Sequence, residues 1–387
     1  PITAVNDADA VSEDKSITRS TSSSQELDHD DTDPDGDDAS GSFTITAIRT
    51  GRESSSSGNV TGTVGEVLNG TYGALTVSSN GSYLYAATRS GADALAAGAT
   101  AIDYFTYTVR DHFGGDTDTA ELAITVTGVG PGAVNDTDTV AENGSLNRNA
   151  AAGVLDNDDD NASFDQENLI VTNISSNSTG NSGNATQGVL GTYGTLTVAA
   201  DGSYTYTANT AAAEALAAGD NSQTDVFTYT VKDDNGVNAD TATLTITIQG
   251  QDDDPVASAD TGTATEDGPQ VSVSAASGVL ANDTDVDAGE TLVVSAVGGS
   301  GANVGQNVTG SLGTLNLDAD GSYTYIADQA GADAITAGQT ATDTFAYTLS
   351  DGEGTTSTVN LVITVTGKGP QGVADTASVA ENATVAK

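Results

Sequence analysis

The sequence contains no cysteine, no tryptophan and no methionine, and only two histidines. Without cysteine, neither a disulfide nor a thiolate metal site can form. Basic side chains are also scarce, with 10 Lys and Arg residues against 55 Asp and Glu residues. Because contact with phosphate requires Lys and Arg, we predict no binding to nucleic acid. No apolar run is long enough to cross a bilayer, so we also predict no membrane insertion.

Side-chain groupings typical of enzymes are missing as well. His29 and His112 occur only in the first third of the sequence and have no counterpart later, which is typical of surface residues. Paired carboxylates can hydrolyse glycosides, but there is no tryptophan to line a sugar cleft. We therefore predict that the protein is not an enzyme.

The excess of acid gives the chain a formal net charge of −45. Such self-repulsion destabilises a compact fold unless the charge is screened or neutralised. High external salt would screen it, and bound Ca²⁺ would neutralise it. Because disulfides are impossible, Ca²⁺ held by oxygen ligands would also fasten the chain. We predict Ca²⁺ as the cofactor.

The chain is built from an internal repeat of roughly 120 residues. An opening phrase, Ala4-Val5-Asn6-Asp7, returns as Ala133-Val134-Asn135-Asp136. A middle phrase rich in glycine occurs at Gly70–Leu75, Gly191–Leu196 and Gly310–Leu315. We place the repeats at 1–129, 130–251 and 252–368. Residues 369–387 match an opening strand, either the first strand of a fourth repeat or a strand donated to a neighbour.

Each repeat alternates apolar and polar residues in segments separated by turn signals. The alternation predicts seven or eight short strands per repeat, an all-β sandwich of immunoglobulin-like type. Asn80-Gly81, Asp201-Gly202 and Asp320-Gly321 favour type I′ hairpin turns. One short helical turn is expected in each repeat, at 92–97, 213–218 and 332–337.

One strand of each repeat carries an aspartate at both ends, in the pattern Asp-x-Phe-x-Tyr-x-x-x-Asp. Phe and Tyr two residues apart share a buried face of a strand. The two aspartates are separated by roughly 26 Å of extended chain, so they cannot bind one ion. Each pole of a repeat therefore receives one acid, which predicts a string of domains joined by divalent cations. The pairs are Asp103 and Asp111, Asp225 and Asp233, and Asp343 and Asp351.

A second acidic cluster follows each opening phrase, at 31–38, 156–160 and 282–287. Carboxylates at alternate positions of a turn can converge on one cation. The form Asp-x-Asp-x-Asp-Gly at Asp31 is like the start of an EF-hand loop, but Ser42 stands where the final glutamate belongs. The alternative interpretation is that these clusters are solvated turns, since Asp, Asn and Gly favour loops.

Together these phrases resemble the VCBS and bacterial cadherin-like repeats of large secreted adhesins and surface proteins. The resemblance rests on the opening phrase, on Gly278-Val-Leu-Ala-Asn-Asp283, on the Asp-Gly-Ser-Tyr hairpin and on the Asp-x-Phe-x-Tyr strand. It implies tandem immunoglobulin-like (cadherin-like) sandwiches in an elongated array, with Ca²⁺ at the domain junctions. The first repeat departs from the pattern, because Gln25-Glu-Leu-Asp-His-Asp30 stands in place of Gly-Val-Leu-x-Asn-Asp.

Sandwich topology assigns the acids to poles and gives a set of expected metal ligands. At the junction of repeats 2 and 3 we expect Glu142, Asp225, Asp252, Asp253, Asp254, Asp283, Asp285, Asp287 and Asp351. At the junction of repeats 1 and 2 we expect Glu13, Asp103, Asp136, Asp158, Asp160 and Asp233. At the outer poles we expect Asp31, Asp33, Asp35 and Asp111, and Glu266, Asp343 and Asp375. The linker Gly128-Val-Gly-Pro-Gly132 supplies no acid, so the first junction should be the more flexible.

We predict an extracellular, cell-surface stalk in which neighbouring repeats are partners and Ca²⁺ stiffens the array. Two alternatives remain open. One is a module that binds surface glycans or proteins through the unusual first repeat, with its Arg49 and Arg52. The other is a self-assembling filament, sheath or surface layer in which residues 371–387 pair with the next subunit.

Overall fold

The computed structural model describes residues 2–21, 26–34, 43–55, 57–111, 115–159, 169–233 and 236–369. The protein is all-β, and each of the three repeats is a sandwich of two sheets, as the alternation predicts. The chain divides into two compact units. One comprises Pro1–Thr210 with Ser222–Ile248, and the other Ala211–Asn221 with Gln249–Lys387.

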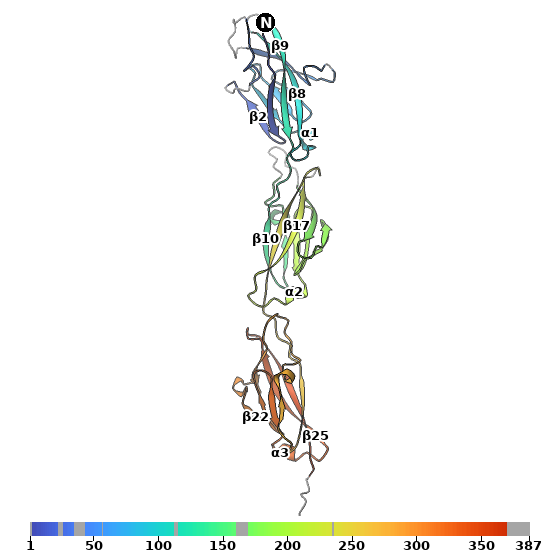
Figure 1. Ribbon diagram of the computed structural model, residues 1–387, viewed down its shortest axis with the longest axis vertical. Coiled ribbons are helices and arrows are strands. Elements are labelled where there is room, and N and C mark those ends of the chain that lie inside the picture. Colours follow the sequence, from blue (N-terminus) through green and yellow to red (C-terminus); the bar gives the residue numbers. More distant parts are fainter. Residues whose placement is uncertain are drawn as a thin grey trace, which may run out of the picture. The chain divides into compact units, whose positions relative to one another are not determined.

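Within its described residues, repeat 1 contains strands β1 to β9, of which β2, β8 and β9 are labelled in Figure 1. The first sheet has the order β1 (Asp7–Ser12), β9 (Thr117–Thr127), β8 (Thr100–Arg110), β3 (Thr44–Thr50) and β4 (Thr61–Gly62). The second has the order β2 (Ser16–Arg19), β7 (Tyr83–Ala86), β6 (Ala74–Val77) and β5 (Val67–Asn69). The pair β1 and β9 is parallel, whereas the other paired strands are antiparallel.

Repeats 2 and 3 follow the same plan. The first sheet of repeat 2 has the order β10 (Asp136–Ala141), β18 (Ala239–Gln249), β17 (Gln223–Lys232), β12 (Ile170–Ser176) and β13 (Ser182–Asn184). Its second sheet has the order β11 (Ser145–Arg148), β16 (Tyr204–Ala208), β15 (Gly194–Val198) and β14 (Val189–Leu190). The first sheet of repeat 3 has the order β19 (Asp260–Thr265), β26 (Thr356–Thr366), β25 (Thr340–Ser350) and β21 (Val293–Val297). Its second sheet has the order β20 (Val271–Val273), β24 (Tyr323–Ile326), β23 (Thr314–Leu317) and β22 (Asn307–Thr309).

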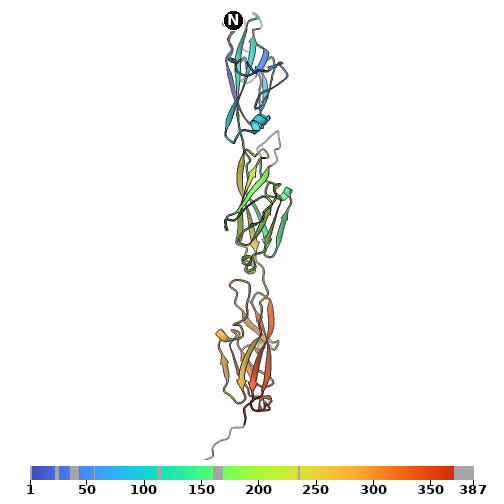
Figure 2. The ribbon, with the colours of Figure 1, turned by 90° about the vertical axis from the view of Figure 1, so that its right-hand side faces the viewer.

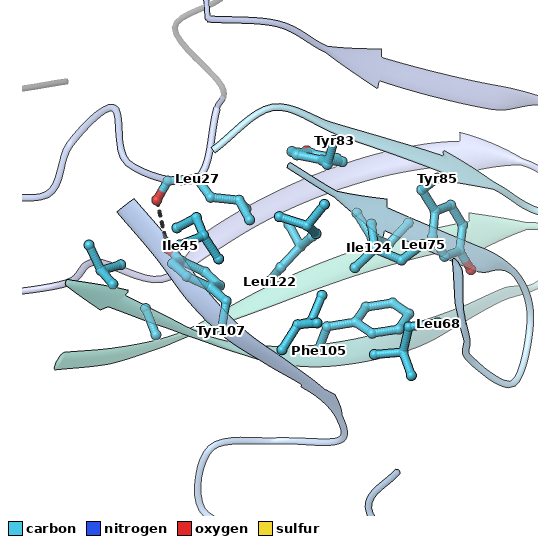
Figure 3. Close-up of a cluster of buried hydrophobic side chains, with 14 of the residues drawn as sticks. Leu27, Ile45, Leu68, Leu75, Tyr83, Tyr85, Phe105, Tyr107, Leu122 and Ile124 are labelled. Carbon is cyan, nitrogen blue, oxygen red and sulfur yellow. Dashed lines mark hydrogen bonds between the residues drawn. The ribbon is translucent and has the colours of Figure 1, made fainter. Parts of the chain in front are cut away.

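The core of each repeat is centred on the Phe of the Asp-x-Phe-x-Tyr strand. In repeat 1, Phe105 meets Tyr85 edge to face, with ring centroids 6.1 Å apart, between the two sheets (Figure 3). Tyr206 with Phe227, and Tyr325 with Phe345, repeat this contact at 6.2 and 6.1 Å. An edge-to-face pair adds about 1 kcal/mol to the stabilisation gained by burying the rings. Leucine, isoleucine and valine side chains complete these cores.

The hairpin turns differ from the predicted type I′. Gly81, Gly202 and Gly321 have φ near +80°, but the Asn or Asp before each glycine does not adopt positive φ. In repeat 1 the Gly81 N–H donates to the Ser78 carbonyl, and the Ser78 N–H donates to the Ser82 carbonyl. This is a three-residue loop, a type I turn closed by a left-handed glycine. The Asn80 carboxamide oxygen accepts the Ser82 N–H and so adds a side-chain bond across the turn.

The short helices begin two residues earlier than predicted. They are α1 (Ser90–Asp93), α2 (Ala211–Glu214) and α3 (Ala330–Asp333), and 3₁₀ turns lie at Ala150–Ala152, Ala275–Ser277 and Gly301–Asn303. In Figure 2, α1 lies at the end of repeat 1 opposite the N-terminus. The chain leaves the helix after Asp93, where the Leu95 N–H donates to the Ala92 carbonyl, three residues back. Leu95, which is partly buried, packs against the core.

Candidate metal site

The first aspartate of each Asp-x-Phe strand is a buried hydrogen-bond acceptor inside its own repeat. Asp225 is fully buried. One of its oxygens accepts the Thr192 N–H at 2.7 Å. The other accepts the N–H groups of Tyr193 and Gly194 at 3.0 Å and the Tyr206 hydroxyl at 2.7 Å. Asp103 and Asp343 make the equivalent four bonds in their repeats.

The two glycines of the Gly-x-x-Gly phrase leave the space in which this carboxylate lies. A Cβ on Gly191 would lie 2.2 Å from the Asp225 Oδ2, and a Cβ on Gly194 would lie 2.5 Å from the Tyr206 ring. Only glycine therefore lets the backbone amides approach the acid closely. Donors already saturate these oxygens, so Asp103, Asp225 and Asp343 hold the interior of the sandwich together.

The opening aspartate of each repeat forms a cluster with a tyrosine at the N-terminal pole. The Tyr107 hydroxyl lies 2.5 Å from the Asp7 Oδ2 and 2.9 Å from the Leu27 carbonyl, the bond drawn in Figure 3. The Asp31 Oδ1 accepts the Val5 N–H at 2.7 Å. Burial, together with neighbouring carboxylates, raises the pKa of Asp7 to about 8 and that of Asp31 to about 7.

The same cluster recurs in the other two repeats. Tyr229 bonds Asp136 at 2.8 Å, and burial raises the pKa of Asp136 to about 6. Burial also raises the pKa of Asp158, which accepts the Val134 N–H. In repeat 3, Tyr347 bonds both Asp260 and Asp283. A buried acid with a raised pKa has lost solvation that a bound cation could replace.

A glutamate marks the opposite pole of each repeat. Glu13, Glu142 and Glu266 are all buried. The Glu13 carboxylate accepts the Val129 N–H at 2.8 Å, and Glu266 accepts the Lys368 N–H at 2.7 Å. Each of these two acids therefore holds the first linker residues after the last strand of its repeat.

Among the described residues, close groups of three carboxylates lie at the N-terminal pole of repeat 3. One oxygen from each of Asp252, Glu290 and Asp351 lies within 4.8 Å of the others, and the same is true of Asp285, Asp287 and Glu290. The Asp287 Oδ2 accepts the Asp253 N–H at 2.9 Å, so the linker is already tied to this loop. Two bonds between Val256 and Thr284 continue the attachment.

The oxygens of this group fit a hard cation. Buried oxygens of Asp252, Asp253, Asp285, Asp287 and Glu290 have no hydrogen-bond partner in the part of the chain that the structure describes. Burial and the adjacent acids raise the pKa of Glu290 to about 7. Ca²⁺ takes six to eight oxygen ligands, mostly carboxylates, carbonyls and water. This donor set, all oxygen and rich in charge, matches that preference.

The remaining expected ligands divide between poles or lie outside the described residues. Asp111 and Asp233 are buried, and the Asn238 N–H lies 3.3 Å from both Asp233 oxygens. Asp33 is partly buried, whereas Asp254 is exposed and belongs to neither group at the pole of repeat 3. Asp35, Asp160 and Asp375 lie outside the described residues, and so does the terminal segment 370–387.

Glu290 and Asn238, which take part in these arrangements, were not predicted from the sequence. Glu290 follows the alternating acids of its loop by three residues and has no equivalent in an Asp-x-Asp pattern. Asn238 carries no charge, yet it joins repeats 1 and 2 within one compact unit. Its carboxamide oxygen accepts the Ala97 N–H at 2.7 Å, and its amide donates to the carbonyls of Leu95 and Val129. Neighbouring repeats thus contact each other directly at this linker.

None of the described helices is long and apolar enough to span a membrane. Among characterised proteins, the calcium-binding lectin RapA2 of Rhizobium johnstonii is 29% identical over 235 residues, covering 54% of this chain and 94% of that protein. Among solved structures, mouse cadherin-23 EC22-24 has a TM-score of 0.38 and 14% identity, covering 94% of this chain and 95% of that one. The protocadherin GammaB4 extracellular domain has a TM-score of 0.38 and 12% identity, covering 94% and 50%.

The model of the bacterial cadherin-like domain matches the sequence three times, at residues 1–128, 129–250 and 252–367. These matches account for nearly the whole sequence and coincide with the three sandwiches. The chain therefore belongs to the bacterial cadherin-like domain family.

Proposed function

We propose that the chain is a repeat segment of an extracellular, cell-surface protein, and that Ca²⁺ stiffens it as a stalk. The observation that carries the proposal is the gathering of linker and loop carboxylates at the pole of repeat 3, with buried oxygens that lack donors. Membership of a family of adhesion-type domains, which in general are not enzymes, supports the same conclusion. So does similarity to a protein described as a calcium-binding lectin.

Stiffening would act through the linker. Asp252 and Asp253 stand in the segment that connects repeats 2 and 3, whereas Asp285, Asp287 and Asp351 belong to loops of repeat 3. An ion shared between the two sets would fasten the linker to the sandwich and remove its freedom to rotate. Without the ion, carboxylates a few ångströms apart repel one another, and the linker tends to leave the pole.

The test measures the linker in the full chain. One dye on repeat 2 and one on repeat 3 report the distribution of distances by single-molecule energy transfer. We expect Ca²⁺ to narrow this distribution in the wild type. The change Asp252→Asn with Asp253→Asn should keep it broad at the same Ca²⁺ concentration, because two charged ligands are lost.

The matched control is Asp254→Asn, which removes the adjacent but exposed acid. It should behave as the wild type does. A wild-type distribution that ignores Ca²⁺, or a control that broadens as much as the double variant, would contradict a linker-based stiffening.

A second candidate function, glycan binding, is favoured by a groove in repeat 1. The groove has a volume of about 350 Å³ and includes Asn59, Asn69 and Tyr104 in its lining. The Arg52 guanidinium stacks 3.7 Å from the centre of the Tyr104 ring. Val226 and Thr344 take the place of Tyr104 in the other repeats. An aromatic face with amides and a cation suits a sugar ring that carries polar or acidic groups.

For this second function, we expect Tyr104→Val, which copies repeat 2, to weaken saccharide binding at least tenfold. Calorimetric titration of the full chain with neutral and uronic-acid oligosaccharides measures it. The control is Tyr193→Val, at a partly exposed tyrosine of repeat 2 outside the groove. The absence of saccharide binding by the wild type, or equal losses in both variants, would count against a site in this groove.

A further inference from the structure

The segment Glu26–Asp31 of repeat 1 follows the same backbone path as 153–158 and 278–283. The Leu27 N–H donates to the Gly81 carbonyl at 3.2 Å, just as Val154 and Val279 donate to Gly202 and Gly321 at 3.0 Å. This fixes the alignment one residue later than the phrase 25–30 that the sequence suggests. Glu26 then stands where the other repeats have Gly153 and Gly278. Asp28 stands where they have Leu155 and Leu280, and Asp30 where they have Asn157 and Asn282.

The carboxylate of Asp28 occupies the place of a leucine side chain. In repeats 2 and 3 the leucine covers the hairpin glycine, and a Cβ on Gly202 would lie 2.7 Å from the Leu155 Cγ. In repeat 1 a Cβ on Gly81 would lie 2.4 Å from the Asp28 Oδ1. Asp28 is 2% exposed and Glu26 is 8% exposed. Asp28 is therefore buried against the β6–β7 hairpin, and the buried Glu26 stands two residues before it, at positions where repeats 2 and 3 carry leucine and glycine.

One buried oxygen of each acid lacks a donor. The Glu26 Oε2 and the Asp28 Oδ1 are buried and have no hydrogen-bond partner among the residues that the structure describes. Burial, followed by repulsion from Glu26, raises the pKa of Asp28. Nearby, the Asp31 Oδ2 is also buried without a donor. A buried carboxylate is retained in a fold when a proton, a donor or a metal compensates for the lost water.

We propose that repeat 1 binds an additional divalent cation between Glu26 and Asp28, at a site that repeats 2 and 3 do not possess. All the candidate ligands are oxygens, so the class of ion is a hard cation such as Ca²⁺. The site goes beyond the proposed stiffening of linkers, because it lies inside one sandwich, between the 26–31 segment and the β6–β7 hairpin. Its ion would secure that segment where the other repeats use a leucine.

The test counts ions bound to the full chain by equilibrium dialysis with Ca²⁺. The variant Glu26→Gly with Asp28→Leu copies repeats 2 and 3, which fold with those residues. We expect it to bind one Ca²⁺ fewer than the wild type and to melt at a higher temperature in chelator. Asp28→Asn, which keeps the shape and removes the charge, should also bind one fewer. The control Asp30→Asn removes an exposed acid from the same segment and should bind the full number.

An unchanged count in both variants that alter Asp28 would overturn the proposal, and Asp28 would then be a buried protonated acid. Asp285→Asn with Asp287→Asn separates this site from the linker site. That variant should lose one ion at the pole of repeat 3, from the group that Asp285 and Asp287 share with Glu290, and retain the ion of repeat 1. Suppose that the wild type binds ions at repeat 3 and that the variants of Glu26 and Asp28 bind as many ions as the wild type. The proposed stiffening of the linker would then stand, and the proposed site in repeat 1 would be refuted.

Discussion

Removal of Ca²⁺ with a chelator is expected to lower the free energy of unfolding of repeat 3 by about 5 kcal/mol. Two three-carboxylate groups meet at Glu290, so two ions are expected. Each tight ion contributes about 2.7 kcal/mol when free Ca²⁺ is 100 times its dissociation constant. Differential scanning calorimetry of the full chain, in excess Ca²⁺ and in EGTA at moderate salt, measures the difference.

The change Asp285→Asn with Asp287→Asn should remove about half of the Ca²⁺ effect on repeat 3, because only one of the two groups contains these residues. It should also raise the stability of the Ca²⁺-free protein, because two repelling charges are gone. Superimposable melting curves with and without Ca²⁺ would remove the basis for a metal site at this pole.

The free energy of unfolding should depend on pH in opposite directions in the Ca²⁺-free protein and in the protein with excess Ca²⁺. Burial raises the pKa of Asp7 to about 8 and that of Asp31 to about 7, well above their unfolded values. The Ca²⁺-free native state therefore binds more protons than the unfolded state between about pH 4 and pH 8. Its stability should rise as the pH falls through that window. In excess Ca²⁺, protons compete with the metal for carboxylates, so stability should fall instead.

Asp225→Ala is expected to lower the free energy of unfolding of repeat 2 by about 4 kcal/mol. The substitution leaves three backbone amides and the Tyr206 hydroxyl without their common acceptor in a buried site. Each buried donor left without a partner costs about 1 to 3 kcal/mol, and local relaxation recovers part of the total. The melting temperature of repeat 2 should fall by roughly 10 to 15 °C.

The matched control is Asp156→Ala, which removes an exposed acid of the same repeat and should change stability by less than about 0.5 kcal/mol. Both variants should be measured with and without Ca²⁺. If Asp225→Ala lost stability only when Ca²⁺ is present, Asp225 would be a metal ligand and not an acceptor for backbone amides.

The sandwich itself could be predicted because alternation and turn residues act locally. Tyr204 and Tyr206 face one side of a strand whatever the rest of the chain does, and both are buried. The turn type was harder to predict. Asn-Gly and Asp-Gly suit type I′ loops, but a side-chain bond to the following serine selects the three-residue loop instead.

The candidate site could be predicted only in outline. Spacing along a strand predicts which end of the sandwich an acid lies at. It does not reveal whether backbone N–H groups already donate hydrogen bonds to the carboxylate oxygens. Asp225 and Asp285 are both aspartates, and the sequence alone does not distinguish their surroundings. Backbone N–H groups donate to both oxygens of Asp225, whereas one oxygen of Asp285 has no donor. Glu290 and Asn238 depend on loop geometry, for which no short motif exists. The position of Glu26 relative to Gly153 and Gly278 follows only from the hydrogen bond between the Leu27 N–H and the Gly81 carbonyl.

The parallel pairing of the first and last strands has a mechanical consequence. In repeat 1, β1 runs beside β9 in register from Asp7 with Leu122 to Ser12 with Thr127, and repeat 3 has the same pairing. The chain therefore enters a sandwich at one end of this ladder and leaves it at the other. Tension along the chain would pull the two strands past each other and load all their hydrogen bonds together, instead of opening them one by one. A shearing geometry of this kind suits a protein that must transmit force.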